Sequence, residues 1–436
     1  MVDYDLVIIG AGWAGFNAAL RAKELGLKVC LIEKAEIGGT CLNKGCIPTK
    51  TLIQSAKIFS LTKKSAAFGI ETLTPKIAFN KIQERKEKVI QQLRSGMQFM
   101  LKGIDFLNAQ AQILSPEEVK VTEQIIKTKF ILIATGSKPI ELSKIKFDRQ
   151  KVVSSDEILD LKEIPSSLLI IGGGIIGCEF ASLFSALGSR VCIVELMPQL
   201  LLGVDSEIAK KIETVFKKKG IRVSTNTDAT SVDLRSYNLI LVCVSRAPQT
   251  EGLGLEELGV KLKKGKIIVD EYLKTSIPNI FAAGDCTGKI MLAHFAAYQG
   301  RIAAENIANP NNLRKADNTI IPNCIFTDPE IASVGLTEEN ATEKGIEIKI
   351  NKFDFLGSGM ARIIDETEGF IKVVSDKKTE QILGASIIGP KATELIAIFG
   401  LAVSVNLKLS QIRQTIFAHP TLSECITEAL GPNYAI

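Results

Sequence analysis

The sequence has few of the residues on which several common kinds of site depend. Its 436 residues include two histidines and one tryptophan, and aromatic side chains make up only 6%. Neither histidine belongs to a His/Cys cluster with zinc spacing, so we expect no metal centre. Long apolar runs are missing, which excludes a membrane-spanning helix, and the short run from Leu6 to Ile9 follows two acids, unlike a signal peptide. We therefore expect a cytoplasmic protein with no membrane partner.

Neither sign of charge is in strong excess. The formal net charge is +5, and the basic residues are spread along the chain without a recognition motif, so we expect no nucleic-acid partner. The cysteines number nine, and seven of them are scattered singly, which is typical of buried thiols in a reducing compartment. The length and a hydrophobic content of 46% predict two or three domains around large cores.

The clearest positive feature is an internal repeat. Residues 5–34 (DLVIIGAGWAGFNAALRAKELGLKVCLIEK) and 167–196 (SLLIIGGGIIGCEFASLFSALGSRVCIVEL) align without a gap. Each copy runs from an apolar strand through a glycine turn and an amphipathic helix to a second strand that ends on an acid. This is the pattern of a βαβ dinucleotide site, in which the turn and the helix N-terminus hold a pyrophosphate. The matched residues are Gly10, Gly12, Gly15 and Glu33 in the first copy and Gly172, Gly174, Gly177 and Glu195 in the second.

Two copies imply two dinucleotides. A glycine-rich turn without a ligand is the plain alternative, but both copies carry the strand, the helix and the correctly spaced acid. Glu195 suits a free ribose 2′-hydroxyl and repels a 2′-phosphate, and Leu196 and Met197 offer no cationic partner for one. The second copy therefore favours NAD over NADP.

The remaining cysteines, Cys41 and Cys46, lie in the segment GGTCLNKGCIPTK, residues 38–50. In a regular helix, Cα atoms five residues apart are roughly 8.7 Å apart. A disulfide needs them within about 7 Å. A bond between these cysteines therefore requires a distorted turn, which Asn43 and Gly45 could supply. Because 49–63 has helical spacing, Cys46 is expected near a helix N-terminus, where the helix dipole favours a thiolate.

One of the two histidines has an acid at a suggestive distance. His419 lies in FAHPTLSE, and Glu424 follows five residues later, where a turn after Pro420 could bring the carboxylate to the imidazole. Such a pair can act as a general acid and base with a fixed tautomer. The plain alternative is a helix start capped by Thr421 or Ser423.

Together, GGTCLNKGCIPTK, ILIATGSKP (131–139), IFAAGDC (280–286) and FAHPTLSE (417–424) resemble the pyridine nucleotide-disulfide oxidoreductases, in family order over almost the whole chain. The resemblance implies an α/β fold with two Rossmann-like dinucleotide-binding domains and a C-terminal α+β dimerisation domain. The FAD-binding domain is expected at 1–145 and 272–316, the NAD-binding domain at 146–271 and the dimerisation domain at 317–436, where an alternating strand pattern begins at Ile320.

The resemblance also implies residue roles. Cys46 would lie beside the flavin, and Cys41 would exchange with a dithiol substrate. His419 of the partner subunit, oriented by Glu424, would take the substrate's proton, and the His419–Pro420 bond would be cis. Besides the glycines and acids of the repeat, the residues expected to contact FAD or NAD are Lys34, Gly39, Thr40, Lys50, Ala111, Thr135, Gly136, Glu179, Asp285, Ala293, Ser245 and Arg246.

Details of the motifs resemble the branch of the family that oxidises dihydrolipoamide. The implied activity is oxidation of protein-bound dihydrolipoamide to lipoamide by a homodimer, with FAD and NAD as cofactors. The implied partners are lipoylated proteins and components of a 2-oxo acid dehydrogenase complex. Three alternatives stay open: another NADH-dependent disulfide reductase, a diaphorase that passes electrons to quinones, and a low-activity structural subunit of a dehydrogenase complex.

Several positions depart from the family pattern, most of them on the NAD side. The stretch between Val223 and Leu239 is shorter than in typical relatives. Ile175 stands where an aromatic residue often gates the nicotinamide pocket, and Ser245 replaces a usual glycine. Tyr298 stands where an acid is usual. The NAD domain is therefore expected to differ most from its relatives.

Overall fold

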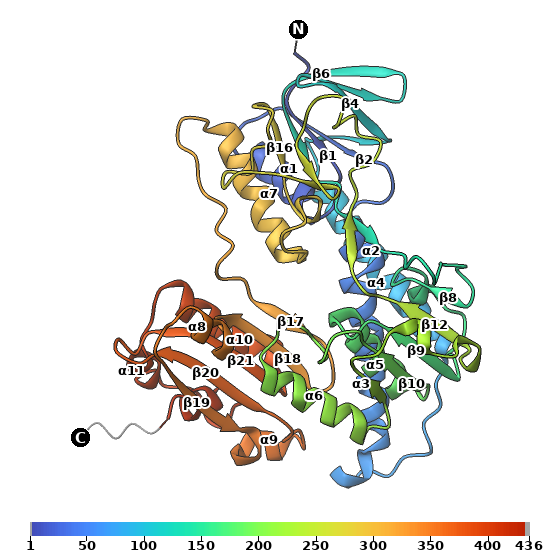
Figure 1. Cartoon of the computed structure of the whole chain (residues 1–436), viewed down its shortest axis with the longest axis vertical. Coiled ribbons are helices and arrows are strands. Elements are labelled where there is room, and N and C mark those ends of the chain that lie inside the picture. The colour runs from blue at the N-terminus through green and yellow to red at the C-terminus, as the bar shows by residue number, and fades with distance from the viewer. Residues whose placement is uncertain (1, 432–436) are drawn as a thin grey trace.

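The computed structural model describes residues 2–431, which form three sheet-based regions (Figure 1). Parallel strands with crossover helices build the first two regions, and an antiparallel sheet with helices builds the third. The predicted α/β class with two Rossmann-like units is therefore confirmed. Within residues 2–431, no helix has both the length and the apolar character needed to cross a membrane.

The first sheet has a parallel core extended by an antiparallel hairpin. β1 lies between β2 and β6, and the chain returns much later to add β16 beside β6 in parallel. This late return matches the expected division of the FAD domain, although the domain limits themselves stay a prediction. The strands, in spatial order, are β3 (Asp105–Asn108), β2 (Val29–Glu33), β1 (Tyr4–Ile9), β6 (Gln124–Ile133), β5 (Glu118–Val121) and β4 (Ala111–Ser115), with β16 (Ile280–Ala282) beside β6.

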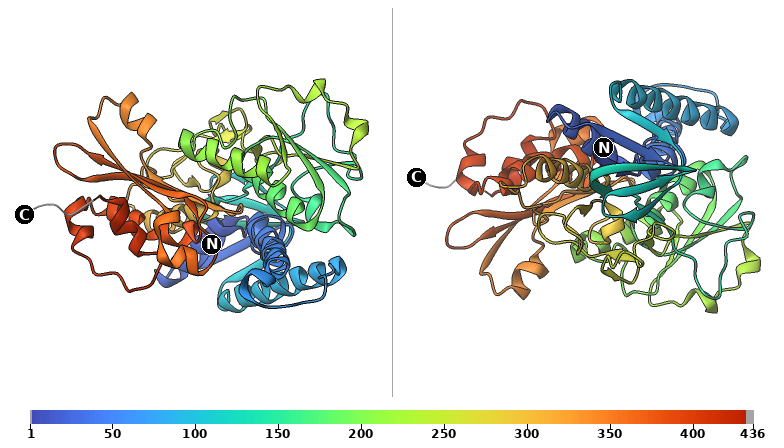
Figure 2. Two further views of the ribbon diagram at one scale, coloured as in Figure 1. Left: turned by 90° about the horizontal axis from the view of Figure 1, so that it is seen from below. Right: turned by 90° about the horizontal axis from the view of Figure 1, so that it is seen from above.

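Five helices belong to this region. In both views of Figure 2, α3 and α4 extend to the side of the molecule opposite the C-terminal sheet. The helices α1 and α7 pack closely, because a Cβ atom at Gly300 would lie 2.1 Å from the Ala14 carbonyl oxygen. The helices are α1 (Trp13–Glu24), α2 (Gly39–Lys44), α3 (Cys46–Lys63), α4 (Phe79–Met100) and α7 (Ala293–Ala308).

The second sheet is entirely parallel and carries the second repeat. Its strands, in spatial order, are β11 (Arg222–Ser224), β10 (Arg190–Val194), β9 (Ser167–Ile171), β12 (Leu239–Val242) and β8 (Val152–Val153), and its helices are α5 (Ile175–Leu187) and α6 (Ser206–Lys218). Between β11 and β12 the chain makes only two short 3-10 turns, Ala229–Ser231 and Leu234–Ser236. The first sheet has a hairpin at the corresponding place, so the shortened stretch corresponds to a lost excursion.

Two short strand pairs lie outside these sheets. β7 (Ser137–Pro139) pairs with β13 (Arg246–Pro248), and β14 (Leu262–Lys263) pairs with β15 (Lys266–Ile267). The first of these pairs lies where the chain crosses between the two nucleotide-binding regions, so it fixes both crossings against each other.

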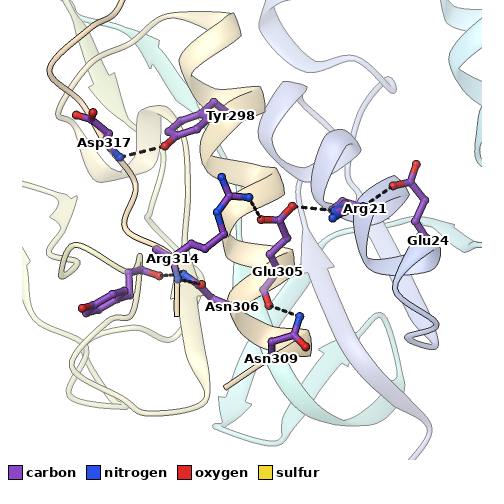
Figure 3. Close-up of polar contacts among 9 residues, drawn as sticks. Arg21, Glu24, Tyr298, Glu305, Asn306, Asn309, Arg314 and Asp317 are labelled. Carbon is purple, nitrogen blue, oxygen red and sulfur yellow. Dashed lines mark hydrogen bonds and ion pairs between the residues drawn. The ribbon is translucent and has the colours of Figure 1, made fainter. Parts of the chain in front are cut away.

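The linker that leaves α7 is held against that helix by side-chain contacts (Figure 3). The Asn306 side chain accepts a hydrogen bond from the Arg314 backbone N–H at 2.7 Å, and Glu305 pairs with both Arg21 of α1 and Arg314. The Tyr298 hydroxyl accepts a bond from the Asp317 backbone N–H at 3.1 Å. The unusual Tyr298 therefore helps to fix the path of the linker.

The C-terminal region is an antiparallel sheet backed by α10. Its strands, in spatial order, are β17 (Asn323–Ile325), β18 (Glu330–Gly335), β21 (Ile382–Gly389), β20 (Phe370–Asp376) and β19 (Ile348–Asp354). The strand pattern predicted from Ile320 onward is confirmed by β17 and β18. The helices are α8 (Glu338–Glu343), α9 (Gly359–Ile363), α10 (Ala392–Ser404), α11 (Leu409–Arg413) and α12 (Glu424–Ala429).

A buried ion cluster joins the second and third regions. Lys372 on β20 is 1% exposed, and its ammonium lies 2.9 Å from Asp205, 2.8 Å from Glu207 and 2.6 Å from Glu338. Asp205 is also the N-cap of α6 and accepts bonds from the backbone N–H groups of Glu207 and Ile208. Burial by itself would lower the pKa of Lys372, but hydrogen bonds to the three carboxylates raise it. The cluster therefore ties the start of α6 to the C-terminal sheet.

We expect Lys372→Met to lower the free energy of unfolding by about 3–5 kcal/mol, because it leaves the buried Asp205 carboxylate without its cation. The partly exposed pair Lys211–Glu368 offers a matched control, because it also joins a side chain of α6 to the C-terminal region. Lys211→Met should cost less than about 1 kcal/mol. Denaturant unfolding of both variants measures the difference, and equal losses would contradict a special role for the buried cluster.

Candidate active site

The two glycine turns have the same backbone shape. Gly10 and Gly172 have φ values of +105° and +113°, and a Cβ at Gly15 or Gly177 would lie 1.8 or 2.0 Å from the carbonyl oxygen of Gly10 or Gly172. No side chain fits these positions without moving the helix away from the strand. The helices α1 and α5 start directly after Gly12 and Gly174, so their free N–H groups face the turns.

An acid stands beside each turn, as the repeat predicted. Glu33 accepts a hydrogen bond from the Ala11 backbone N–H at 2.8 Å, and Glu195 accepts one from the Gly173 backbone N–H at 2.6 Å. Both carboxylates follow the second strand of their βαβ unit, beside the turn that would hold a pyrophosphate. The turn, the helix end and the acid together fit one dinucleotide at each unit.

Further residues expected around FAD gather at the first turn. Gly10 packs against Thr135, whose hydroxyl is buried without a hydrogen-bond partner in the described chain, and Gly39 packs against Gly12. Asp285 accepts a bond from the Ser137 hydroxyl at 2.6 Å, and burial raises the pKa of its carboxyl. An unpartnered buried hydroxyl beside such a turn fits a polar ligand. Of the other expected contacts, Lys34 directly follows β2, Thr40 is the second residue of α2, Ala111 starts β4, Gly136 follows Thr135 and Ala293 starts α7.

The expected NAD contacts after the second unit lie differently. Arg246 donates to the hydroxyl of Ser137 at 2.8 Å and to its carbonyl oxygen at 2.9 Å, so it binds the serine that contacts Asp285. Ser245 precedes it, and its carbonyl oxygen accepts a bond from the Ile140 backbone N–H. Their contact with NAD stays a prediction, and their observed contacts join the two nucleotide-binding regions.

The cysteine pair spans a break between two helices. α2 ends at Lys44, Gly45 adopts φ −150° and ψ −114°, and α3 begins at Cys46. The break at Gly45 and the place of Cys46 at a helix N-terminus are confirmed, and Pro48 is accommodated in the first turn of α3. The expectation that Asn43 helps to form the distorted turn was wrong, because Asn43 is helical and its amide donates to the carbonyl oxygens of Ile37 and Gly39.

Both sulfurs are free thiols in the structure, the reduced state of the pair. A hydrogen bond from the Cys41 thiol to the Cys46 sulfur lowers the pKa of Cys46 to about 7, whereas burial opposes the shift and the Lys50 ammonium adds to it. The same hydrogen bond raises the pKa of Cys41. The pair therefore loses its first proton from Cys46.

Lys50 and Glu179 form an ion pair one helical turn beyond Cys46. The Lys50 ammonium lies 2.8 and 2.7 Å from the two carboxylate oxygens of Glu179, whose side chain is 4% exposed. Glu179 also accepts a bond from the Phe326 backbone N–H at 3.0 Å. This joins α3, α5 and the C-terminal region at one carboxylate.

His419 and Glu424 meet at the start of α12, in the C-terminal region. The His419 Nδ1 atom lies 2.8 Å from the Glu424 Oε1 atom, and the other carboxylate oxygen accepts a bond from the Thr421 backbone N–H. The His419–Pro420 bond is cis. The alternative of a helix start capped by Thr421 or Ser423 is wrong, because Ser423 makes no side-chain capping bond and the Thr421 hydroxyl donates to the Ala418 carbonyl oxygen. α12 packs on β19 and β20, and Figure 1 shows these two strands away from α2.

The sequence reasoning gave no role to two residues at this site. Trp13, the first residue of α1, lies beside Cys41, and Phe326 supplies a backbone N–H to Glu179. The position of Trp13 as the sole tryptophan, inside the first glycine motif, was a usable signal. Nothing in the sequence singles out a backbone N–H such as that of Phe326.

Comparisons with known proteins find similarity along nearly the whole chain. The family model for pyridine nucleotide-disulphide oxidoreductases matches residues 4–300, and the model for their dimerisation domain matches 321–430. Dihydrolipoyl dehydrogenase of Bacillus subtilis (strain 168) is 38% identical over 98% of this chain and 97% of its own length. Its namesake in Chlamydia muridarum is 39% identical over 98% and 96%.

Among solved structures, the HOCl-induced flavoprotein disulfide reductase RclA from Escherichia coli is similar, with a TM-score of 0.88. It is 30% identical and the match covers 98% of this chain and 99% of that one. The Bacillus alignment spans 463 positions, more than the 436 residues of this chain, in keeping with the lost excursion before β12.

We expect Cys41→Ala to raise the pKa of Cys46 from about 7 toward the ordinary thiol value of 9.0, because the hydrogen bond from Cys41 is the main cause of the lowering. A lowered pKa means that the thiolate is present above about pH 7 and is lost below it, so the variant should hold less thiolate at neutral pH. Thiolate absorbance of the reduced protein against pH, with Cys46→Ser as the blank, measures this. An unmoved midpoint near 7 would assign the lowering to Lys50 instead.

Proposed function

This chain belongs to the pyridine nucleotide-disulphide oxidoreductase family, and from that membership we propose that it oxidises protein-bound dihydrolipoamide to lipoamide and reduces NAD⁺ to NADH. The observation that carries the proposal is the thiol pair Cys41 and Cys46, held at a helix break beside the first dinucleotide turn. Curated relatives named dihydrolipoyl dehydrogenase, similar along the full chain, support the choice of substrate.

FAD supplies hydride and electron transfer between the thiol pair and NAD when it is bound. The residues that would hold it are the glycines of the first turn, Glu33, Thr135 and Asp285. Cys46 is the sulfur with the lowered pKa and lies one helical turn from Lys50 in α3, so it would be the thiolate beside the flavin. Cys41 is the sulfur that exchanges with the substrate. NAD would lie at the second turn, with Glu195 on its ribose.

Oxidation of a dithiol by a disulfide requires a base for the substrate thiol. In this proposal His419 takes that proton, and the Glu424 carboxylate fixes its tautomer through Nδ1 and leaves Nε2 free to accept. The His419 side chain is 83% exposed in the single chain, and α12, which follows it, packs on β19 and β20, strands that Figure 1 shows away from α2. The base therefore comes from the partner subunit of a homodimer, which the matched dimerisation domain supports.

The proposed partners are lipoylated proteins of a 2-oxo acid dehydrogenase complex. The proposed location is the cytoplasm, in keeping with seven further cysteines that are all unpaired. The shortened NAD domain keeps the turn, the helix and the acid, so it does not favour the structural-subunit alternative.

We expect His419→Ala to lower NADH formation from dihydrolipoamide by about 10²–10⁴-fold, the usual contribution of a positioned base. Cys41→Ser should abolish it. Reduction of a quinone by NADH, which bypasses the interchange, should persist in both variants. If wild type reduces quinone but makes no NADH from dihydrolipoamide, the protein is a diaphorase and the proposal is wrong.

A mixed dimer tests whether His419 acts across the interface. A heterodimer of Cys41→Ser and His419→Ala chains contains one complete site if the two groups meet across subunits, and none if they act within one chain. Unfolding and refolding an equal mixture makes half of the dimers mixed, so activity should return to about a quarter of wild type. No recovery in a mixture whose dimers have exchanged would contradict the shared site.

A further inference from the structure

The sole tryptophan of the chain stands at the first position of α1, inside the first glycine motif. The second copy of the repeat has Ile175 at the equivalent position, so the fold of a glycine turn does not require an indole there. The Nε1 atom of Trp13 is buried, yet it has no hydrogen-bond partner within residues 2–431. A buried N–H without an acceptor is costly, so a stable structure normally has a reason to retain one.

The group beside this N–H is the thiol of Cys41. α1 and α2 approach each other closely, because a Cβ at Gly39 would lie 2.7 Å from the Gly12 Cα atom. This contact brings the start of α1 against the helix that carries Cys41. The hydrogen bond between Cys41 and Cys46 and the burial of Cys41 raise the pKa of Cys41. The Trp13 N–H and the Lys50 ammonium act to lower it. The Trp13 N–H and the Cys41 sulfur therefore lie close enough to interact.

We propose that the Trp13 indole N–H is a hydrogen-bond donor to the Cys41 sulfur during thiol–disulfide interchange, which makes Trp13 a further catalytic residue of the proposed reaction. In the reduced resting pair, Cys41 is a neutral thiol that donates to Cys46, and a neutral sulfur is a weak acceptor. Negative charge on Cys41 turns the same sulfur into a strong acceptor, and the N–H is then already in place.

The charge arises in one step of the interchange. The first substrate thiolate attacks Cys41 of the Cys41–Cys46 disulfide, and Cys46 leaves as a thiolate. The second substrate thiolate then attacks the substrate sulfur of the mixed disulfide, so that a substrate S–S bond forms, the bond to Cys41 breaks and Cys41 leaves with the electron pair. A thiol of lower pKa leaves faster. A donor to Cys41 therefore accelerates the second displacement.

Packing alone is the competing explanation, and Trp13→Phe separates the two. Phenylalanine keeps an aromatic ring that can fill most of the same volume, and it removes the N–H. Trp13→His has a smaller ring that again carries an N–H donor. It can therefore restore part of a change in Cys41 that is caused by loss of the donor, but it cannot restore a change that is caused by loss of volume.

The test measures Cys41 directly in flavin-loaded protein and needs no substrate. Cys46→Ser leaves Cys41 as the only thiol of the pair. The pH midpoint for its carboxamidomethylation by iodoacetamide is then followed by peptide mass, with Cys30, a buried thiol, as the internal control. Adding Trp13→Phe should raise the midpoint by about half to one pH unit, the size of one hydrogen bond. Alkylation below the midpoint should slow by about three- to tenfold. An unchanged midpoint would overturn the proposal.

A second measurement keeps Trp13 in place. Because the chain has one tryptophan, its emission in the Cys46→Ser protein should titrate with the same midpoint as Cys41 alkylation, and this dependence should vanish in Cys46→Ser/Cys41→Ala. Emission that does not follow the Cys41 midpoint contradicts the contact. The inference rests on the proposed function only for its role in turnover. If wild type fails to oxidise dihydrolipoamide while the midpoint still shifts, the substrate assignment is wrong and the donor role stands.

Discussion

The ion pair between Lys50 and Glu179 is the contact on which the arrangement of the site depends. Lys50 lies on the cysteine helix, Glu179 lies on the helix of the second dinucleotide unit, and the same carboxylate binds the Phe326 backbone N–H at the start of the C-terminal region. Because the Glu179 side chain is almost fully buried, loss of Lys50 would leave a charge without a partner inside the protein. One carboxylate therefore sets the distance between the thiols, the expected NAD turn and the C-terminal sheet.

The two dinucleotide units share a sequence pattern but are supported differently. The first is completed by a hairpin and by α7, which packs against α1 through Gly300. The second dinucleotide unit lacks the excursion before β12, and it is stabilised instead by a contact with the C-terminal sheet. The Leu201 backbone N–H bonds the Gly173 carbonyl oxygen, and Asp205, four residues on, meets buried Lys372. The segment between Glu195 and α6 is thus fixed at both ends, so a shortened domain still presents an ordered turn.

Much of this could be predicted because it is encoded locally. Glycine spacing and strand–helix periodicity predict both βαβ units, and the geometry of a five-residue spacing predicts the break at Gly45. The contacts of Trp13, Arg246 and Lys372 could not be predicted, because each depends on how separate elements approach one another. Arg246 shows the limit clearly. The motif suggests a contact with NAD, whereas tertiary packing places its guanidinium on Ser137. Local sequence patterns show which functional groups are present, and tertiary packing decides which of these groups contact one another.

The pair of His419 and Glu424 has physical properties that make sense only in an assembly. In the single chain the two side chains are 83% and 35% exposed, and an ion pair in water contributes little to stability. A carboxylate surrounded by water also orients an imidazole weakly, because solvent competes for both groups. Burial against a second subunit would lower the local dielectric and strengthen the same 2.8 Å contact. Dimerisation would therefore do more than bring His419 to the thiols, since it would also create the environment in which Glu424 can control its proton.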